Sequence, residues 1–399
     1  MFTCSRFKDS AKVGCTWPNF GESFPAPIDP SHVLQFLIRA PTYDCQIVCT
    51  LRYFLVAFVD SCLLSTAASV ICAFHSLKLL QMALAAGRRP QQLRPFLNIA
   101  SIGQRRRYML SSYVVTSKEL DAALKKNAPS KISTDPRVIP ICAAWFMPND
   151  PAGRTGIETF KKKRIPTARF FDVDGIKDHD SPYPHMLPTC EVFAEAMEKL
   201  GIRKDDELVV YDTEELGLFS APRVGWTLRV YGHPRVHILN NFRLWVKEGF
   251  PTVSGEAETF EATKYPVPSY HTDMVVKFAE MKTIGYDYNK EGAEEIQILD
   301  ARSPGRWEGS EPEPRPDLRS GHMPGSTNIP FQEMLDPETK ALLAPEELRK
   351  VFESKNLDPN KPIIASCGTG VTAAILEAGL TASDFGKPND RRVYDGSWM

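Results

Sequence analysis

The sequence lacks an excess of charge of either sign, because its 399 residues include 48 Lys and Arg and 49 Asp and Glu. A nucleic-acid-binding domain usually carries a basic patch and a high isoelectric point, so we expect no nucleic-acid partner. Clusters of metal ligands are also lacking, since Cys45 and Cys49 have no second pair and no nearby His to complete a zinc site. The sequence therefore predicts no metal site.

The cysteines do not form a recognisable disulfide framework. There are nine of them, an odd number, and they lie scattered along the chain. This number and distribution of cysteines indicate a protein of a reducing compartment rather than a secreted protein stabilised by disulfides. The composition, with 43% hydrophobic residues, is that of a globular protein, and the length allows two or three domains of ordinary size.

Long apolar runs are scarce, and the best candidate is residues 53–74. This run is long enough to cross a bilayer, but Asp60 and several Ser and Thr residues interrupt it. We therefore do not expect a membrane span there.

A basic segment begins at Met82 and contains six arginines, several serines and no acidic residue before Glu119. This composition is typical of a mitochondrial transit peptide, with processing near residue 108 or 109. Because 81 residues precede Met82, translation would have to start at Met82, and a disordered basic tail is the alternative. We expect residues 1–108 to be an N-terminal extension and the protein to be mitochondrial, with the cytoplasm as the alternative.

The most informative stretch is Cys367-Gly-Thr-Gly-Val-Thr-Ala373, which follows an apolar run and precedes a helical pattern. A strand, a glycine-containing loop and a helix start bring backbone N–H groups and the positive end of a helix dipole to one sulfur. Such a site favours the thiolate, which is the nucleophilic form of cysteine. The alternative is a buried cysteine beside an ordinary turn. The loop residues expected to bind a substrate are Gly368, Gly370, Val371 and Thr372.

The spacing in this loop argues against a phosphatase. A cysteine-based phosphatase needs an arginine six residues after the nucleophile to hold the phosphate, and Ala373 occupies that position. Phosphoryl transfer is therefore not expected.

The chain repeats itself at a nearly constant offset. Four segments of the first copy correspond to four of the second: 139–144 to 296–301, 164–168 to 322–326, 207–212 to 362–367, and 236–240 to 392–395. Asp212 therefore stands where the second copy has Cys367. We expect the first copy to have lost the chemistry and to form a wall of the site.

Short apolar runs in both copies alternate with amphipathic helical patterns at 190–200 and 345–352. This alternation predicts an α/β fold with two domains, each a mainly parallel sheet flanked by helices. The expected boundaries are 109–252 for the non-catalytic first copy, 253–272 for a linker, and 273–399 for the catalytic second copy.

Several long segments together resemble the tandem-domain rhodanese family across about residues 110–399, and within it most closely the 3-mercaptopyruvate sulfurtransferases. The segments are FFDVD (170–174), SPYPHMLP (181–188), YDTEELGLFSAPRVGW (211–226), ARSPGRWEGSEPEPR (301–315), GHMPGSTNIPF (321–331) and CGTGVTA (367–373).

The resemblance implies a two-step sulfur transfer without a cofactor. The Cys367 thiolate would take sulfur from 3-mercaptopyruvate, release pyruvate, and pass the sulfur to a thiol, thioredoxin or cyanide. Arg306 and Arg315 match the arginines that bind the donor carboxylate. Read without the family, both could be surface groups paired with Glu311 and Glu313.

The resemblance also implies a relay in which Asp174 orients His185 and Thr369 supplies a hydroxyl. The alternative is that His185 only hydrogen-bonds its proline-rich loop. Thiosulfate sulfurtransferases carry basic residues just after the cysteine, whereas this chain has Gly368 and Thr369. A thiosulfate:cyanide sulfurtransferase and a non-catalytic scaffold or persulfide carrier remain the alternative functions.

The chain departs from the family pattern at its C-terminus. Relatives continue past the Tyr394-Asp-Gly-Ser-Trp motif with a further helix, whereas this sequence ends at Met399. We therefore expect the second copy to be truncated, with apolar surface exposed as a result.

Overall fold

The computed structural model describes residues 110–130, 133–288, 290, 295–315 and 317–399. The apolar run at 53–74 and the basic segment from Met82 lie outside the described residues. Residues Arg107–Met399 form one compact unit. Within the described part, no helix combines the length and the apolar character needed to cross a membrane.

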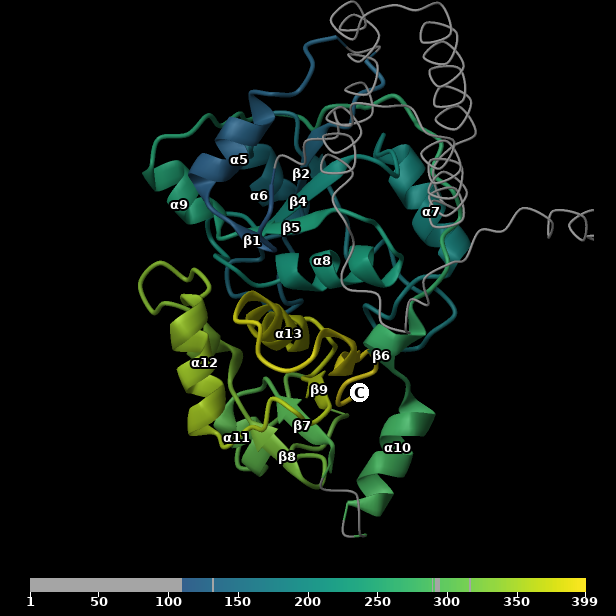
Figure 1. The fold of residues 1–399 in the computed structure, drawn as a ribbon, viewed down its shortest axis with the longest axis vertical. Coiled ribbons are helices and arrows are strands. Elements are labelled where there is room, and N and C mark those ends of the chain that lie inside the picture. Colours follow the sequence, from purple (N-terminus) through teal and green to yellow (C-terminus); the bar gives the residue numbers. More distant parts are fainter. Residues whose placement is uncertain (1–109, 131–132, 289, 291–294, 316) are drawn as a thin grey trace, which may run out of the picture. The chain divides into compact units, whose positions relative to one another are not determined.

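The first copy contains a parallel sheet of five strands in the order β1-β5-β4-β2-β3 (Figure 1). Its central strands are buried along their whole length because helices cover both faces, as is usual for parallel sheets. The strands are β1 (Val114–Val115), β2 (Val138–Cys142), β3 (Arg169–Phe170), β4 (Glu207–Tyr211) and β5 (Val236–Leu239).

The second copy repeats this topology in the order β6-β10-β9-β7-β8, again entirely parallel. The four repeated segments predicted from the sequence fall on or beside equivalent strands, which confirms the predicted fold class. The edge strands β1 and β6 were not predicted because two residues are too short for a pattern. The strands are β6 (Val275–Val276), β7 (Gln297–Asp300), β8 (Ser326–Asn328), β9 (Ile363–Ser366) and β10 (Arg391–Tyr394).

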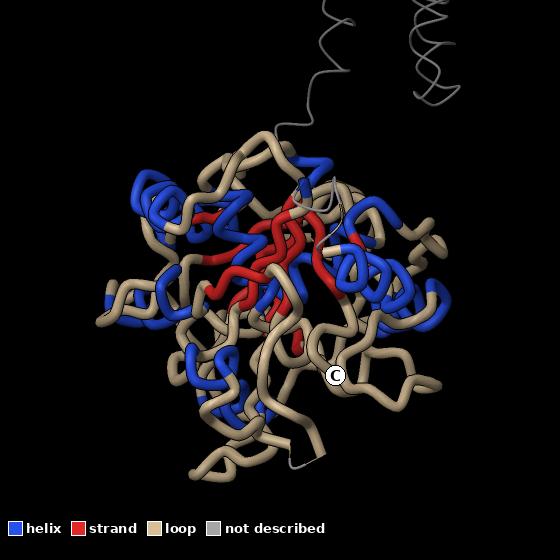
Figure 2. The backbone as a smooth tube through the Cα atoms, turned by 90° about the horizontal axis from the view of Figure 1, so that it is seen from below, coloured by secondary structure: helices blue, strands red, loops and turns tan. Residues whose placement is uncertain are grey.

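Helices surround the strands, which gather in the middle of the molecule (Figure 2). The predicted helices at 190–200 and 345–352 are present as α7 and α12. The helices are α5 (Ser117–Leu124), α6 (Gly156–Lys162), α7 (Cys190–Lys199), α8 (Ala221–Val230), α9 (Phe242–Lys247), α10 (Phe278–Asp287), α11 (Pro304–Glu308), α12 (Pro345–Ser354) and α13 (Ala373–Ala382), with 3₁₀ turns at Thr272–Met274, Phe331–Met334 and Pro388–Asp390.

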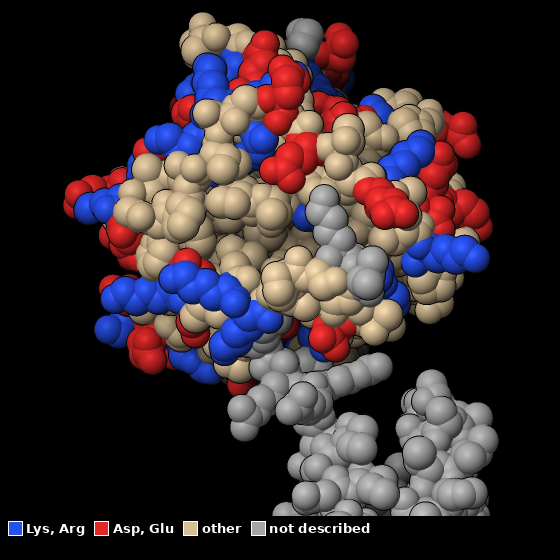
Figure 3. Space-filling view, turned by 90° about the horizontal axis from the view of Figure 1, so that it is seen from above, with Lys and Arg blue, Asp and Glu red and all other residues tan. Residues whose placement is uncertain are grey.

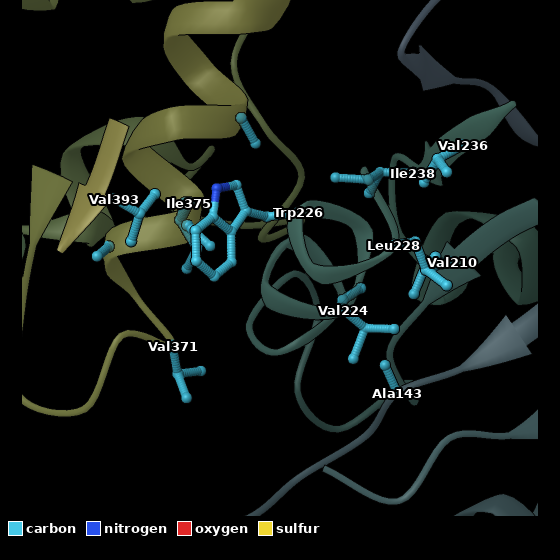
Figure 4. Close-up of a cluster of buried hydrophobic side chains, with 14 of the residues drawn as sticks. Ala143, Val210, Val224, Trp226, Leu228, Val236, Ile238, Val371, Ile375 and Val393 are labelled. Carbon is cyan, nitrogen blue, oxygen red and sulfur yellow. The ribbon is translucent and has the colours of Figure 1, made fainter. Parts of the chain in front are cut away.

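The two copies share one hydrophobic cluster. Trp226 of α8 is fully buried and lies beside Ile375 and Val393 of the second copy (Figure 4). Polar contacts also join the copies, since Arg229 pairs with Glu377 at 2.8 Å. Because this shared core holds the two copies together, side chains of both can line a single site.

The surface carries balanced charge, as the composition predicts. On the face drawn in Figure 3, basic and acidic side chains are interspersed around a central area of uncharged residues.

Candidate active site

Cys367 lies directly after β9, in the loop that leads into α13, and is 2% exposed. The backbone N–H of Gly370 donates to its Sγ atom at 3.1 Å. Gly370 has a φ of +79°, and a Cβ at this position would meet Arg223 Nη1 at 2.6 Å and the carbonyl oxygen of Asp395 at 3.1 Å. Glycine is therefore required here for both conformation and space.

Ser397 holds the other side of the cysteine. Its Oγ atom accepts the N–H of Cys367 at 3.1 Å and lies 3.8 Å from Sγ. The N–H of Trp398 donates to the carbonyl oxygen of Cys367 at 3.0 Å. No local pattern predicts this contact, because β10 brings Ser397 to β9 only through the order of strands in the sheet.

A cavity of about 370 Å³ opens over Cys367. Both copies line it, as predicted for a wall contributed by the first copy. The first copy supplies Trp145, Met147, Pro148, Asn149 and Phe219, and the second copy supplies Arg302, Arg306, Glu313, Arg315, Phe331, Gly368, Thr369, Val371, Thr372 and Met399, among others.

The two predicted carboxylate-binding arginines differ in their partners. Arg306 donates to both oxygens of Glu313, with Nη2 at 2.5 Å. Glu313 is buried and also accepts from Arg302 at 2.8 Å. Arg302 is in turn held by Asp300. Pairing with a glutamate, the alternative considered from the sequence, thus applies to Arg306 through Glu313.

Arg315 has no ion-pair partner among the described residues. Its Nη1 atom lies 2.9 Å from Sδ of Met399, and its side chain lines the cavity. A thioether is a weak acceptor, so the guanidinium charge of Arg315 is the one best placed to meet a carboxylate in the cavity.

Asp174 and His185 are brought together, with Oδ1 of Asp174 at 3.0 Å from Nε2 of His185. Burial lowers the pKa of His185, which is 3% exposed, so its imidazole is neutral at pH 7. The hydrogen bond from His185 in turn lowers the pKa of Asp174. The Nδ1 atom of His185 is buried and has no hydrogen-bond partner in the described part of the chain.

Thr369 is not joined to this pair. Its hydroxyl makes no hydrogen bond with His185 in the structure, and it lines the cavity whereas His185 does not. Trp145, which the sequence did not single out, lines the same cavity as Thr369 and contacts the Asp174–His185 pair. Its indole N–H donates to Asp174 at 2.8 Å, and its ring lies edge-on to His185 with centroids 4.5 Å apart.

Arg223 links the loops of the two copies. It is 2% exposed and donates through Nη2 to the carbonyl oxygen of His185 and to Asp395, both at 2.5 Å. Asp395 also accepts the N–H of Leu187 at 3.0 Å. This buried ion pair holds the segment that carries His185 against the loop that carries Cys367, because Arg223 also contacts the carbonyl of Gly370.

No group of three or more His, Cys, Asp or Glu side chains in the described residues could hold a metal ion. What the arrangement offers chemically is a buried sulfur with an amide donor, an unpaired arginine and a neutral imidazole oriented by a carboxylate. These are the parts needed for nucleophilic attack on an anionic substrate.

Comparisons with known proteins agree with this geometry. The Rhodanese-like domain model matches residues 287–399. The thiosulfate sulfurtransferase TUM1 of Saccharomyces cerevisiae is 42% identical over 275 residues, covering 66% of this chain and 87% of the relative. The mitochondrial thiosulfate/3-mercaptopyruvate sulfurtransferase 1 of Arabidopsis thaliana is 42% identical over 270 residues, covering 64% and 69%.

Among solved structures, SseA from Escherichia coli, described as a 3-mercaptopyruvate sulfotransferase with the rhodanese fold, superposes with a TM-score of 0.60 at 33% identity. The match covers 72% of this chain and all of SseA. The similarity to SseA thus spans both sheets of the described chain. The chain is a member of the tandem-domain rhodanese family of sulfurtransferases.

Proposed function

We propose that this chain is a 3-mercaptopyruvate sulfurtransferase that works through a persulfide on Cys367. The observation that carries the proposal is that one cavity holds both a buried sulfur, which accepts the N–H of Gly370, and the guanidinium of Arg315, which has no acidic partner among the described residues. The thiolate needs a charge-stabilising loop, and a 2-oxo acid donor needs a cation for its carboxylate.

In the first half-reaction the Cys367 thiolate attacks the sulfur of 3-mercaptopyruvate. An S–S bond forms, the carbon–sulfur bond breaks, and the electron pair leaves on carbon as the enolate of pyruvate, which then takes up a proton. In the second half-reaction a thiolate acceptor attacks the outer sulfur and leaves with it, which regenerates the Cys367 thiolate. Sulfur itself carries the chemistry, so no cofactor is required.

The proton for the enolate is the proposed task of His185 and Asp174. A neutral imidazole held by a carboxylate can accept a proton from one group and pass it to another, so the buried ring is charged only transiently. The Thr369 hydroxyl lines the cavity over Cys367 and is proposed to complete the relay when a donor is bound.

The choice of donor is argued from charge. The relatives are named for thiosulfate as well as for 3-mercaptopyruvate as sulfur donors. Thiosulfate is a dianion and favours a loop with its own cations, whereas Gly368 and Thr369 provide none. Arg315 supplies one unpaired charge, which suits a monoanionic carboxylate better. A thiosulfate:cyanide sulfurtransferase is therefore the second candidate.

The test is pyruvate release by the purified protein with 3-mercaptopyruvate or thiosulfate as donor, alongside Cys367→Ser. A strong preference for 3-mercaptopyruvate that disappears in the variant supports the proposal. A preference for thiosulfate overturns the choice of donor but keeps the sulfurtransferase chemistry. A protein that accepts sulfur from a partner but makes no pyruvate is a persulfide carrier.

The acceptor and the compartment are proposals of the same kind. A dithiol protein such as thioredoxin fits the chemistry of the second half-reaction. A mitochondrial location rests on the arginine-rich segment from Met82. Import into isolated mitochondria of a chain that starts at Met82, compared with the full-length chain and followed by N-terminal sequencing of the product, tests the location.

A further inference from the structure

Asp212 of the first copy occupies the position that Cys367 occupies in the second, directly after the equivalent strand β4. It cannot carry sulfur, yet its side chain is fully buried and fully engaged. Its carboxylate accepts the N–H groups of Phe219 at 2.7 Å and Ala221 at 2.9 Å, and the hydroxyl of Ser220 at 2.6 Å. A buried carboxylate is costly unless it is satisfied in this way, so its retention calls for a role.

The hydrogen bonds continue from Ser220 toward the candidate active site. The hydroxyl hydrogen of Ser220 is directed at Asp212, which leaves its lone pairs to accept the backbone N–H of Trp145 at 3.0 Å. The indole N–H of Trp145 then donates to Oδ2 of Asp174 at 2.8 Å. The other oxygen of Asp174 meets Nε2 of His185 at 3.0 Å. Every link is within ordinary hydrogen-bond distance.

We propose that the sulfur-free centre of the first copy positions the Asp174–His185 pair: Asp212 and Ser220 hold Trp145 in place, and Trp145 fixes the orientation of the Asp174 carboxylate. Asp212, Ser220 and Trp145 are then positioning residues. The inference deepens the proposed function and rests on it for the role of His185.

Asp174 needs a partner that fixes its carboxylate because its side chain is largely exposed to solvent. The side chain of Asp174 is 59% exposed, so by itself it would sample several rotamers in water. The indole anchors one oxygen and leaves the other facing Nε2 of His185. A carboxylate at Nε2 keeps the proton on that nitrogen in the neutral ring. The buried Nδ1, which has no partner in the described residues, is thereby kept as the proton acceptor.

The variants that test this are Trp145→Phe, which removes the indole N–H but keeps an aromatic, though smaller, side chain, and Ser220→Ala, which removes the hydroxyl three hydrogen bonds from His185. The matched control is Thr213→Val. Thr213 is the neighbour of Asp212, is 1% exposed, and its hydroxyl has no hydrogen-bond partner within the described chain. This control therefore removes a buried hydroxyl from the same loop without breaking a link.

The first readout is the ¹⁵N spectrum of the histidine rings in a Cys367→Ser background, with the His185 signals identified by their loss in His185→Gln. This measurement needs no turnover. We expect the native protein and Thr213→Val to show the Nε2–H form, and Trp145→Phe and Ser220→Ala to show a mixture of both tautomers. Native-like tautomers in both variants would overturn the inference.

The second readout is steady-state kinetics with 3-mercaptopyruvate on chains that retain Cys367. We expect each variant to lower kcat by about tenfold or more, because a misoriented imidazole loses part of the roughly 10²–10⁴-fold that a positioned acid–base group contributes. The double variant Trp145→Phe with Ser220→Ala should be no worse than the single ones, because both act through Asp174. Strictly additive losses would contradict a shared route.

The ¹⁵N spectra and the kinetics together distinguish a failure of the proposed function from a failure of this inference. If no protein releases pyruvate, the proposed function is wrong and the ¹⁵N spectra alone decide whether the chain of hydrogen bonds sets the tautomer. If Ser220→Ala unfolds at a lower temperature than Thr213→Val, Trp145→Phe carries the test, since it keeps an aromatic ring at the position that stacks on Phe219.

Discussion

At the scale of single residues, the arginines of the site differ in whether an acidic side chain already neutralises their charge. Glu313 neutralises Arg306 and also binds Arg302, whereas Arg315 faces the cavity without an acidic partner in the described residues. The two arginines therefore differ in how much binding energy each can give to a donor carboxylate.

Arg315→Ala should lower kcat/KM for 3-mercaptopyruvate by about tenfold to a hundredfold, because a hydrogen bond between charged groups contributes about 1.5–3 kcal/mol. Arg315→Lys should recover part of this loss, since it keeps the charge but not the planar fork. Steady-state kinetics with pyruvate detection measures both. An unchanged kcat/KM in the alanine variant would remove Arg315 from the binding site.

Gly370→Ala should abolish sulfur transfer and destabilise the fold. The new Cβ would be both in the left-handed region and 2.6 Å from Arg223. The control is Gly249→Ala, because Gly249 has a φ of +76° with open space around its Cβ position. Thermal unfolding of both variants separates the cost of the backbone conformation, about 1–2 kcal/mol, from the cost of the clash. Equal losses in the two variants would contradict the clash.

At the scale of elements, a buried histidine fastens the connecting segment to the first copy. Nε2 of His233 donates to the carbonyl oxygen of Asp206 at 2.9 Å, so Nδ1 accepts the hydroxyl of Tyr265 at 2.8 Å. Tyr265 lies within the predicted linker 253–272 and is 3% exposed. The segment thus docks on α7 and its surroundings, where Tyr265 meets the ring of Phe193.

This histidine predicts a loss of stability in acid. Burial lowers the pKa of His233 to about 4, whereas in the unfolded chain it is about 6.5. Between these values the unfolded state binds a proton that the folded state does not, so the free energy of unfolding falls as pH falls. The contribution from pH 7 to pH 5 is about 2 kcal/mol. Urea unfolding of native protein and His233→Gln at both pH values measures it, and identical pH slopes would contradict the prediction.

At the scale of the whole molecule, Trp226 and its neighbours form a core that both copies share, so we expect the two copies to unfold together. The pair between Arg229 of α8 and Glu377 of α13 joins the copies at 2.8 Å, and the Glu377 side chain is 2% exposed. Removing the Glu377 charge leaves the guanidinium of Arg229, whose side chain is only 27% exposed, without its partner.

Glu377→Gln should therefore lower stability by about 2 kcal/mol while unfolding remains a single transition. The control is Glu195→Gln in the exposed pair with Lys199, which should change stability by less than about 0.5 kcal/mol. Differential scanning calorimetry measures both. Two separate transitions in either protein would show that the copies unfold independently.

The sequence by itself determined the repeated α/β architecture, because the periodicity of apolar residues and the position of glycines are local properties that a fold of this class requires. It also pointed to Cys367, since the glycine loop and the helix start surround the cysteine within a few residues. The family resemblance added Asp174, His185, Arg306 and Arg315.

Only the tertiary structure decided which of these groups meet. Strand order brought Ser397 to Cys367, and the packing of α8 against α13 brought Arg223 of the first copy to the loop of the second. The pairing of Arg306 with Glu313 and the link from Asp212 to His185 likewise depend on directions that side chains take in space. The contacts of Arg223 with Gly370 and of Ser397 with Cys367 join residues far apart in the chain, so no local pattern encodes them. Burial and hydrogen-bond geometry fix them once the sheets have formed.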